Sequence, residues 1–596
     1  MNVGRLWRTV RHLSPQQIAY AGIRRLRHER RRRQPDAARH SLMQSAQALP
    51  IPDPGASVLE RIAGGVEALQ AAVHNDVDGI PAGRFDFLGR SVDFGALEAV
   101  DWRRRLDEES SPLWRLTLAY FGWAVILIGK DPAYLPRIAA AVAALEQAGD
   151  WTTPGIFRDL WNPYTASHRL INLLVTLSRY RAQGGKAGTP DEVAILDHVR
   201  FCAAHIAADL ERDLQFNHLL KNYVALAVFA AAALSVPASF GWLESAVPRA
   251  LRQIVLPDGG HAERSPMYQV LGLLDLRLLR ETGLFPDTWT PELERRIPAM
   301  ERTLACLTHP DGEIALFGDS WLGGAPPSSA LDLPASAPGV STLPLTGYAR
   351  LDGGDDCVIF DCGLLGAPQN PAHGHADYLS IEASIAGKRF IVDFGTPTYV
   401  TGALRDLSRS AAVHNGPRLA GLEPAELWKS FRVGRRGRAG LLEASELALA
   451  PLWSAGWQDG YGDKGLELRR WVGLWPGQGF VVADLWRGPL AVSSPLSEFL
   501  IADSWQPQAG PGIAFAGPVR LEIEALAGHV EGLGTKTWWP RYGESSGATG
   551  LRLVPDGSGF AAIGFLRSTR AKPALGVIGA IRAALERAPA STAATV

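Results

Sequence analysis

Cysteine is scarce in this chain of 596 residues, which has only four, at positions 202, 306, 357 and 362. Small extracellular domains that depend on disulfides carry proportionally many more, so a disulfide framework is excluded as the basis of the fold. Cys357 and Cys362 are the closest pair, but strand alternation would place them on opposite faces. The tight cysteine pairs of structural zinc sites are therefore missing as well.

An excess of charge of either sign is also lacking. The chain has 60 Lys and Arg residues against 61 Asp and Glu residues, a formal net charge of −1. The whole molecule is therefore not a nucleic-acid binder by bulk electrostatics, and an acidic ligand must be met by a local basic patch.

Long apolar runs are missing too. The apolar stretch 114–128 is interrupted by Arg115 and is shorter than the roughly 20 residues that a membrane-spanning helix needs, so a buried helix is expected there. Residues 1–33 hold many arginines and no uninterrupted apolar core of a signal peptide. We therefore expect a cytoplasmic or membrane-peripheral location, with the periplasm as a further alternative.

The same N-terminal segment places apolar residues at helical spacing among its arginines. They are Val3, Leu6, Trp7, Val10, Ile18, Ile23 and Leu26, and the run Arg30 to Arg33 follows them. A basic amphipathic helix of this kind predicts a peripheral contact with an anionic membrane. The alternative is a helix packed on the body of the protein with a solvated basic end.

A phosphate-binding loop of the G-x-x-x-x-G-K-[ST] type is absent, and we expect no organic cofactor. Carboxylate pairs of glycoside hydrolases are not recognisable from sequence alone. Asp311, Glu313 and Asp319 nevertheless lie close together, which keeps that activity open.

What the chain does contain, from about residue 110, is apolar residues at three- and four-residue steps, which predict a series of helices with short connections. The expected helices are 112–130, 132–147, 163–183, 191–213, 216–234, 242–256, 265–282 and 291–307. Antiparallel helix pairs follow, and periodicity alone equally permits a toroid, a solenoid or a bundle.

Residues 319–346 are rich in Pro, Gly, Ser and Ala, and they mark a domain boundary. Strand-like segments follow at 348–352, 357–362, 378–385, 390–394, 466–475, 480–486, 496–502, 520–525 and 560–566. No helices alternate with them, so a mainly antiparallel sandwich is expected. The predicted domains are a basic N-terminal and lead-in segment 1–100, a helical domain 101–330, a linker 331–346 and a β-sandwich domain 347–596.

His373, His375, His414 and Asp393 all lie within residues 371–416. His373 and His375 are two apart, so an extended strand would point both to the same face. A hairpin turning at Ala386-Gly387 would bring Asp393 back toward His375, and His414 arrives from the next loop. Two imidazoles and a carboxylate make a plausible zinc set of His375, Asp393 and His414. The alternative is a polar sheet edge with unrelated histidines.

Several motifs in this region resemble the heparinase II/III-like family of polysaccharide lyases. They are HGHADYLS at 373–380, VDFGTPTY at 392–399, Arg-Ser-x-x-x-His-Asn at 409–415 and WKSFRVGRR at 428–436. The likeness extends more weakly to FNHLLKNYVAL at 216–226 and GGHAERSPMY at 259–268. The resemblance implies an incomplete (α/α) toroid followed by an antiparallel β-sandwich.

The resemblance also implies roles for individual residues. Asn217 or His218 would neutralise a substrate carboxylate, although Asn217 would also make a good N-cap for the helix that begins there. Tyr268, on the first turn after Ser265-Pro266, and His373 would be catalytic. The zinc would be structural, with His373 free of metal.

Further candidates surround these residues. Trp161, Tyr164 and Arg169 could stack on a sugar or hold a uronate carboxylate, with helix capping and packing as the alternative. In the glycine-rich loop before Tyr268, Glu263 and Arg264 are candidates for substrate binding, and His261 and Glu263 for supporting roles.

These roles suit β-elimination from a uronic acid, which needs a neutralised carboxylate, a base near C5 and an acid at the leaving oxygen. We therefore predict a lyase acting on an acidic polysaccharide such as a glycosaminoglycan, alginate or bacterial exopolysaccharide. A glycan-binding or export-associated scaffold that retains the lyase fold, or a glycoside hydrolase, are the alternatives. The sequence leaves the polymer and the oligomeric state open.

Overall fold

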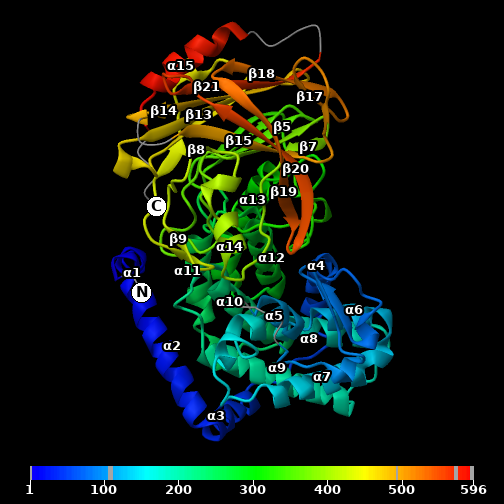
Figure 1. Ribbon diagram of the computed structural model, residues 1–596. Helices are drawn as coiled ribbons and strands as arrows, with labels where there is room; N and C mark the ends of the chain where they lie inside the picture. The colour runs from blue at the N-terminus through cyan, green and yellow to red at the C-terminus, as the bar shows by residue number, and fades with distance from the viewer. Residues whose placement is uncertain (1–2, 105–111, 491–493, 569–574, 591–596) are drawn as a thin grey trace. The chain divides into compact units, whose positions relative to one another are not determined.

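The computed structural model describes residues 3–104, 112–490, 494–568 and 575–590 (Figure 1). By its internal contacts the chain divides into two compact units. We call the one formed by residues 13–254 and 271–297 the helical unit, and the one formed by residues 1–12, 255–270 and 298–596 the sheet unit. The division passes through helices α12 (Pro266–Thr282) and α13 (Pro286–Cys306).

The helical unit consists of amphipathic and buried helices with one small hairpin. Its elements are α2 (Pro15–Arg33), α3 (Pro35–Gln47), α4 (Ser57–Val73), β1 (Arg84–Phe87), β2 (Arg90–Asp93), α5 (Leu113–Ala119), α6 (Gly122–Lys130), α7 (Leu135–Ala148), α8 (Pro163–Ala182), α9 (Pro190–Ala208), α10 (Phe216–Ala232) and α11 (Leu243–Ile254), with the adjoining parts of α12 and α13. Helices α8 and α10 are buried over most of their length and form its centre. The predicted series of helices is thus confirmed.

The expected helix 112–130 is in fact two. Phe121 adopts a left-handed backbone conformation, φ 58°, which no helix continues through, so α5 ends and α6 begins there. In the described residues no single helix is long and apolar enough to cross a membrane. Helices α5 and α6, bent by 43° relative to each other, reach the necessary length and apolar composition only when they are taken together.

The sheet unit holds two large antiparallel sheets. One has the order β11 (Ala439–Leu441), β12 (Leu452–Gln458), β13 (Glu467–Trp475), β14 (Gly479–Arg487), β21 (Phe560–Arg567), β18 (Arg520–Ala527), β17 (Ile513–Ala516), β16 (Gln506–Gln508). The other has the order β19 (His529–Arg541), β20 (Glu544–Val554), β15 (Pro495–Ala502), β7 (Lys388–Ile391), β6 (Ile381–Ile385), β5 (Cys357–Asp361), β4 (Tyr348–Asp352), β3 (Gly339–Leu343), with β8 (Pro417–Leu419) beside β15.

Short elements complete the sheet unit. They are α1 (Val3–Val10), α14 (Ala403–Ser408), α15 (Ile578–Arg587) and the hairpin of β9 (Leu427–Trp428) and β10 (Arg432–Val433). Helix α15 lies along the first sheet (Figure 1), where Ile581 and Leu585 pack with Trp471 and Val481. Apolar packing of this helix therefore closes one face of that sheet.

Three local predictions concern segments of the sheet unit. The hairpin at Ala386-Gly387 is confirmed, because both turn residues have positive φ, 51° and 76°, between β6 and β7. His373 and His375, however, lie in an irregular loop before β6 and not on a strand, so the strand argument for their orientation was wrong. Strand β3 also occupies part of the segment expected to be a linker, 331–346.

Candidate active site

The side chains of Tyr268 and His373 lie against each other in the sheet unit. Their ring centroids are 4.1 Å apart and the planes are inclined by 32°. Tyr268 stands on the first turn of α12, as expected, because Pro266 begins the helix and Ser265 accepts a hydrogen bond from the Tyr268 backbone amide. Both rings are about nine-tenths buried, at 8% exposure each. A hydroxyl and an imidazole thus meet in a largely desolvated place.

Asp319 holds the two histidines of the loop at once. Its Oδ2 lies 2.9 Å from Nδ1 of His373 and its Oδ1 lies 2.9 Å from Nε2 of His375. Arg405 donates to both oxygens of the same carboxylate, at 2.5 and 2.8 Å. Burial by itself raises the pKa of Asp319, but Arg405 and the two imidazoles hold that pKa well below its usual range. The carboxylate is therefore ionised and can only accept.

This acceptor decides which nitrogen of each imidazole carries the hydrogen. His373 donates through Nδ1, so its neutral form has the lone pair on Nε2, whereas His375 donates through Nε2 and has the lone pair on Nδ1. Burial lowers the pKa of His375 to about 4, more than Asp319 raises it, so its ring is neutral at pH 7. One aspartate thus gives the two histidines opposite tautomers and different duties.

Aromatic rings surround His373. Phe431 and Tyr399 lie with ring centroids 5.8 and 6.3 Å from it, and Arg405 stacks 4.9 Å above the centroid of Tyr399. Trp321 contacts Tyr399 edge-on, at 5.5 Å between centroids. Flat rings of this kind suit the apolar faces of sugars.

Sequence reasoning missed this surrounding group. Tyr399 and Phe431 stood inside the quoted motifs VDFGTPTY and WKSFRVGRR, but nothing in their spacing pointed toward His373. Asp319 was noted only as one of several neighbouring carboxylates, and Arg405 carried no signal of its own.

The glycine-rich loop before α12 contributes a second acid. Glu263 is 2% exposed, and burial, with the nearby charge of Asp319, raises its pKa to about 8. His261 lies beside it, with its Nδ1 3.2 Å from the Glu263 amide that donates to it. Burial lowers the pKa of His261 to about 3, so this ring is neutral. Both residues stand behind Tyr268, whose ring centroid is 6.4 Å from that of His261.

Arg264 was expected to bind substrate, and the structure corrects this. Its guanidinium donates to three backbone carbonyls, those of Thr346, Gly366 and Leu345, at 3.0, 2.6 and 2.9 Å. The residue is buried. These three hydrogen bonds fix the loop within the sheet unit, which gives Arg264 a structural role.

Trp161 and Arg169 were also expected to bind substrate, and both assignments are corrected. Trp161 is fully buried and its indole N–H donates to the carbonyl of Gly149. Arg169 is fully buried and donates to the carbonyls of Ala119 and Leu160, at 2.9 and 2.6 Å. The alternative of capping and packing holds for these two residues, whose neighbours close the core of the helical unit.

Tyr164 keeps its candidacy. Its ring is partly exposed and packs on His218, with centroids 4.6 Å apart, and on His168. His218 in turn lies with Nδ1 3.2 Å from Oε1 of the fully buried Glu211. A carboxylate thus orients His218 while 31% of its side chain stays exposed.

Asn217 is not the N-cap of its helix. Helix α10 begins at Phe216, the cap position belongs to Gln215, and no side chain caps it. Gln215 and Phe216 both have positive φ, 59° and 43°, a conformation that costs free energy in non-glycine residues. The capping explanation for Asn217 is therefore excluded, and strained backbone precedes it.

The three residues expected to bind zinc are neighbours, but they do not form a ready metal site. His414 Nδ1 lies 2.8 Å from Oδ2 of Asp393, and the rings of His414 and His375 have centroids 5.4 Å apart. Within the described residues no group of three or more His, Cys, Asp or Glu side chains is arranged to hold a metal ion. These side chains fit zinc only in part. Two buried imidazole nitrogens, His375 Nδ1 and His414 Nε2, have no hydrogen-bond partner among the described residues and could act as ligands.

The class of protein follows from comparisons with known proteins. The family described as "Heparinase II/III-like, C-terminal" matches residues 335–491, which include His373, His375, Asp393 and His414. Residues 335–491 therefore match the C-terminal domain of the heparinase II/III-like family, the family that the motifs predicted.

Solved structures agree on the fold. The chain resembles heparinase III, at 15% identity, with 89% of each chain covered and a TM-score of 0.62. It resembles the heparinase III-BT4657 gene product at 16% identity, covering 92% and 91% of the chains, TM-score 0.55. It also resembles heparan sulfate lyase HepC from Pedobacter heparinus at 15% identity, covering 90% and 88%, TM-score 0.51. These identities show the fold alone, which confirms an incomplete (α/α) toroid and an antiparallel β-sandwich.

A curated relative is more similar over a shorter stretch. Over 181 residues the chain is 31% identical to the FtsZ-localized protein C of Caulobacter vibrioides. This alignment spans 29% of the present chain and 31% of the relative's length.

Proposed function

We propose that this protein is a polysaccharide lyase that cleaves a uronic-acid-containing polymer by β-elimination. The observation that carries the proposal is the contact of Tyr268 with His373, whose tautomer the ionised Asp319 fixes. In this reaction a base removes the C5 proton of the uronate, the C4–O bond breaks, and an acid protonates the leaving oxygen. The product carries a C4=C5 double bond conjugated with its carboxylate.

The two rings supply the acid and the base. His373 presents the lone pair of Nε2 as a base, and Tyr268 donates its phenolic hydrogen to the leaving oxygen. For the opposite C5 stereochemistry, Tyr268 first gives its phenolic hydrogen to Nε2 of His373, then takes the C5 proton as the phenolate and passes it to the leaving oxygen. Glu263, kept protonated at neutral pH by burial, avoids a second negative charge in this part of the unit.

The substrate carboxylate must be neutralised while negative charge builds up on it. We assign this to Asn217 or His218, both at the start of α10. Measuring Asn217→Ala and His218→Ala separates them, because the neutralising residue lowers turnover on a confirmed substrate and the other does not. If neither change lowers turnover, this assignment is wrong.

Absorbance in the ultraviolet tests the proposal directly. We expect digestion of at least one defined uronate polymer to raise absorbance in the ultraviolet, because only elimination forms the conjugated enuronate. Glycosaminoglycans, alginates and bacterial exopolysaccharides are the polymers to screen. Binding without the chromophore would support the glycan-binding scaffold, and new reducing ends without it would support a hydrolase.

The hydrolase alternative loses two of the three carboxylates noted in the sequence, although burial raises the pKa of the third, Glu313. Asp319 is bound by Arg405, and Asp311 is bound by Arg389 at 2.7 Å, which with other contacts lowers the pKa of Asp311 although burial raises it. A glycosidase acid needs a raised pKa instead. Residues 543–547, GESSG, fit the serine-nucleophile pattern G-x-S-x-G, but they lie at the β19–β20 hairpin and not between a strand and a helix.

We also propose a structural zinc ion at His375, Asp393 and His414, for which the Asp393 carboxylate would have to turn from Nδ1 of His414 toward the metal. The two unpartnered imidazole nitrogens support it, and zinc bound there would tie the loop of His414 to the hairpin β6–β7. None of the proton transfers above depends on it.

As a second partner we propose an anionic membrane, and with it a membrane-peripheral location. Helix α2 buries Gln17, Arg24 and Arg31 toward the helical unit and exposes Ile18, Ile23 and Leu26, at 48%, 48% and 73%. The usual amphipathic arrangement is thus reversed, because acidic residues before α10 attract the buried arginines. Exposed apolar residues beside arginines are typical of helices that lie on anionic lipid.

Sedimentation with vesicles of one part phosphatidylglycerol to three of phosphatidylcholine tests this surface. We expect the protein to sediment with them and Ile18→Ser/Leu26→Ser not to, while catalysis stays unchanged. Leu234→Ser is the matched control, since Leu234 is an equally exposed leucine, at 74%, elsewhere in the same unit. Equal sedimentation of the double variant and the control would contradict the proposal.

A further inference from the structure

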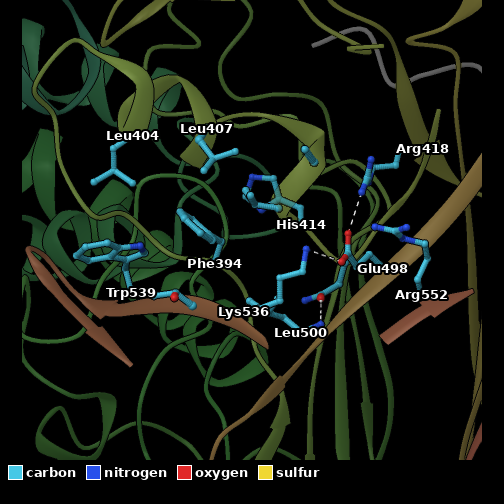
Figure 2. Close-up of a pocket in the computed structure, with 14 residues that line it drawn as sticks. Phe394, Leu404, Leu407, His414, Arg418, Glu498, Leu500, Lys536, Trp539 and Arg552 are labelled. Carbon is cyan, nitrogen blue, oxygen red and sulfur yellow. Dashed lines mark hydrogen bonds and ion pairs between the residues drawn. The ribbon is translucent and has the colours of Figure 1, made fainter. Parts of the chain in front are cut away.

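A pocket of about 520 Å³ opens in the sheet unit beside His414 (Figure 2). Strands β8, β15, β19 and β20, helix α14 and the loops after β7 and α14 supply its walls. Neither Tyr268 nor His373 lines it. It is therefore a second concave site, and its volume falls in the range of small-molecule sites, about 300 to 1,000 Å³.

One half of the pocket is apolar. Phe394, Leu404, Leu407 and Trp539 gather on the same side in Figure 2. Leu404 and Leu407 are 37% and 43% exposed, although Arg405 between them is wholly buried against Asp319. The buried arginine fixes the orientation of α14, so these leucines stay turned outward.

The other half is charged and has more cations than anions. Glu498 accepts from Arg418 at 2.9 Å and from Lys536 at 2.7 Å, one through each oxygen. Arg552 pairs with Glu531 at 3.1 Å. Burial raises the pKa of Glu498, but Lys536 and Arg418 together bring it below its usual value, so it is ionised. Three cations therefore face two carboxylates, an excess of one positive charge.

An unsatisfied donor lies within this charged half. Arg418 is 9% exposed, and its Nε has no hydrogen-bond partner within the described part of the chain, although its Nη2 holds Glu498. A buried guanidinium N–H without an acceptor costs free energy, which a bound acceptor would recover. The missing partner is thus an oxygen acceptor, and the excess positive charge favours an anionic one.

We propose that this pocket binds a uronate residue of an acidic saccharide, away from the Tyr268–His373 pair. The carboxylate meets Arg418 Nε, Lys536 and Arg552, and the apolar face of the sugar ring lies on Trp539 and Phe394. The choice of saccharide rests on the proposed function. Such a site retains a long polysaccharide on the sheet unit while another part of the same polysaccharide is cleaved. Retention raises the effective concentration of the substrate at the reacting groups.

Calorimetry on the Tyr268→Phe protein tests the site without turnover. The probes are a hexasaccharide of glucuronate units and, as the uncharged control, cellohexaose. We expect the acidic hexasaccharide to bind, and Trp539→Ala and Lys536→Ala each to weaken binding at least tenfold with the fold intact by circular dichroism. Lys388→Ala, an exposed lysine of β7 outside the pocket, should leave binding unchanged.

The outcomes separate this proposal from the lyase assignment. If binding depends on Trp539 and Lys536 but the protein cleaves no polymer, the saccharide-binding proposal stands and the lyase proposal is wrong. Cleavage with hexasaccharide binding that neither substitution weakens would overturn the pocket. Equal binding of cellohexaose would overturn the carboxylate argument. Binding of an acidic leucine-rich peptide but no saccharide, with the same dependence on Lys536, would assign the pocket to a protein partner instead.

Discussion

Asp319 determines which ring nitrogen carries the hydrogen in His373 and in His375. A neutral imidazole can carry its hydrogen on either nitrogen, and in solution the two tautomers exchange freely. One buried carboxylate that accepts from Nδ1 of His373 and from Nε2 of His375 removes this freedom from both. Arg405 keeps the carboxylate ionised, so the tautomers hold at neutral pH.

A single substitution can remove the hydroxyl of Tyr268 and leave its ring in place. We expect Tyr268→Phe to lower turnover by about 10²- to 10⁴-fold, the usual contribution of a positioned proton donor. The melting temperature should stay close to that of the natural protein, because the ring and its packing remain. Initial rates on a confirmed uronate polymer measure the effect. His373→Ala should act likewise.

Tyr461→Phe is the matched control for this substitution. Tyr461 is a buried tyrosine of the same unit whose hydroxyl lies at 3.4 Å from the backbone of Leu419 and Leu422. Its change removes the same atom far from the reacting groups, so turnover should be retained. Turnover of Tyr268→Phe equal to that of Tyr461→Phe would remove Tyr268 from the mechanism.

The zinc proposal is tested by composition before activity. Elemental analysis after expression with added zinc should find one zinc ion per chain, and Asp393→Ala should lose it and melt at a lower temperature. A protein without stoichiometric metal refutes the site. Full activity after chelation, with the fold intact, shows that the ion is structural rather than a Lewis acid.

Helix α2 shows at the element scale how ion pairs override an apolar pattern. Arg24 donates to Asp213 at 3.0 Å and to Glu211 at 3.3 Å, and Arg31 lies 3.6 Å from Asp209. Asp209 and Glu211 are fully buried. Leaving these charges without cations would cost more free energy than exposing Ile18, Ile23 and Leu26 of α2. The helix therefore turns its arginines inward.

Breaking this cluster should be costly. We expect Arg24→Met to lower the free energy of unfolding by about 3 to 5 kcal/mol, the usual result of removing one partner of a buried ion pair. Urea titration at pH 7 measures it. Arg25→Met, which changes an exposed arginine of the same helix, should stay within about 0.5 kcal/mol. Equal effects of the two substitutions would contradict the packing of α2.

Buried histidines govern the response of the whole molecule to acid. Burial lowers the pKa of His74 to about 4, and burial, with Arg31 nearby, lowers that of His205 to about 3. The unfolded chain takes up these protons near the ordinary pKa of 6.5, whereas the folded chain does not. The free energy of unfolding should therefore fall as the pH drops below 6.5. Each such histidine contributes up to about 1.4 kcal/mol per pH unit, until the pH reaches the pKa that the histidine has in the folded protein.

Unfolding in urea at pH 7.5, 6.0 and 5.0 measures this loss. His74→Phe, which keeps a ring and removes the titrating group, should lose less stability between pH 7.5 and 5.0 than the natural protein. His40→Phe is the matched control, because His40 is exposed and should not change the slope. A slope of His74→Phe identical to that of the natural protein would rule out this origin of acid sensitivity.

Much of the fold followed from pattern. Helical periodicity after residue 110, strand-like segments after 346 and the turn at Ala386-Gly387 were each local signals, and each corresponds to elements of the structure. The start of α12 at Pro266 was likewise a local signal, which placed Tyr268 on its first turn. Such features depend on neighbours in sequence, so the sequence alone was enough to predict them.

The expectations that failed concerned burial and long-range partners. Trp161, Arg169 and Arg264 have the side chains of sugar-binding residues, but they are buried and donate to backbone carbonyls that lie between 9 and 102 residues away in sequence. His373 and His375 were placed on a strand because they alternate, whereas a loop holds them. Spacing carries no information about which side of a residue the rest of the chain will cover.

We could read from the amino-acid sequence the family motifs, the order of helices before sheets and the candidate pair of Tyr268 and His373. Contacts made in the folded chain establish that Asp319 and Arg405 complete that pair, that α2 turns its arginines inward and that a cationic pocket opens beside His414. The reason is physical: hydrogen bonding, charge pairing and desolvation act between atoms close in space. In this chain those atoms come from residues up to 86 positions apart around Asp319 alone.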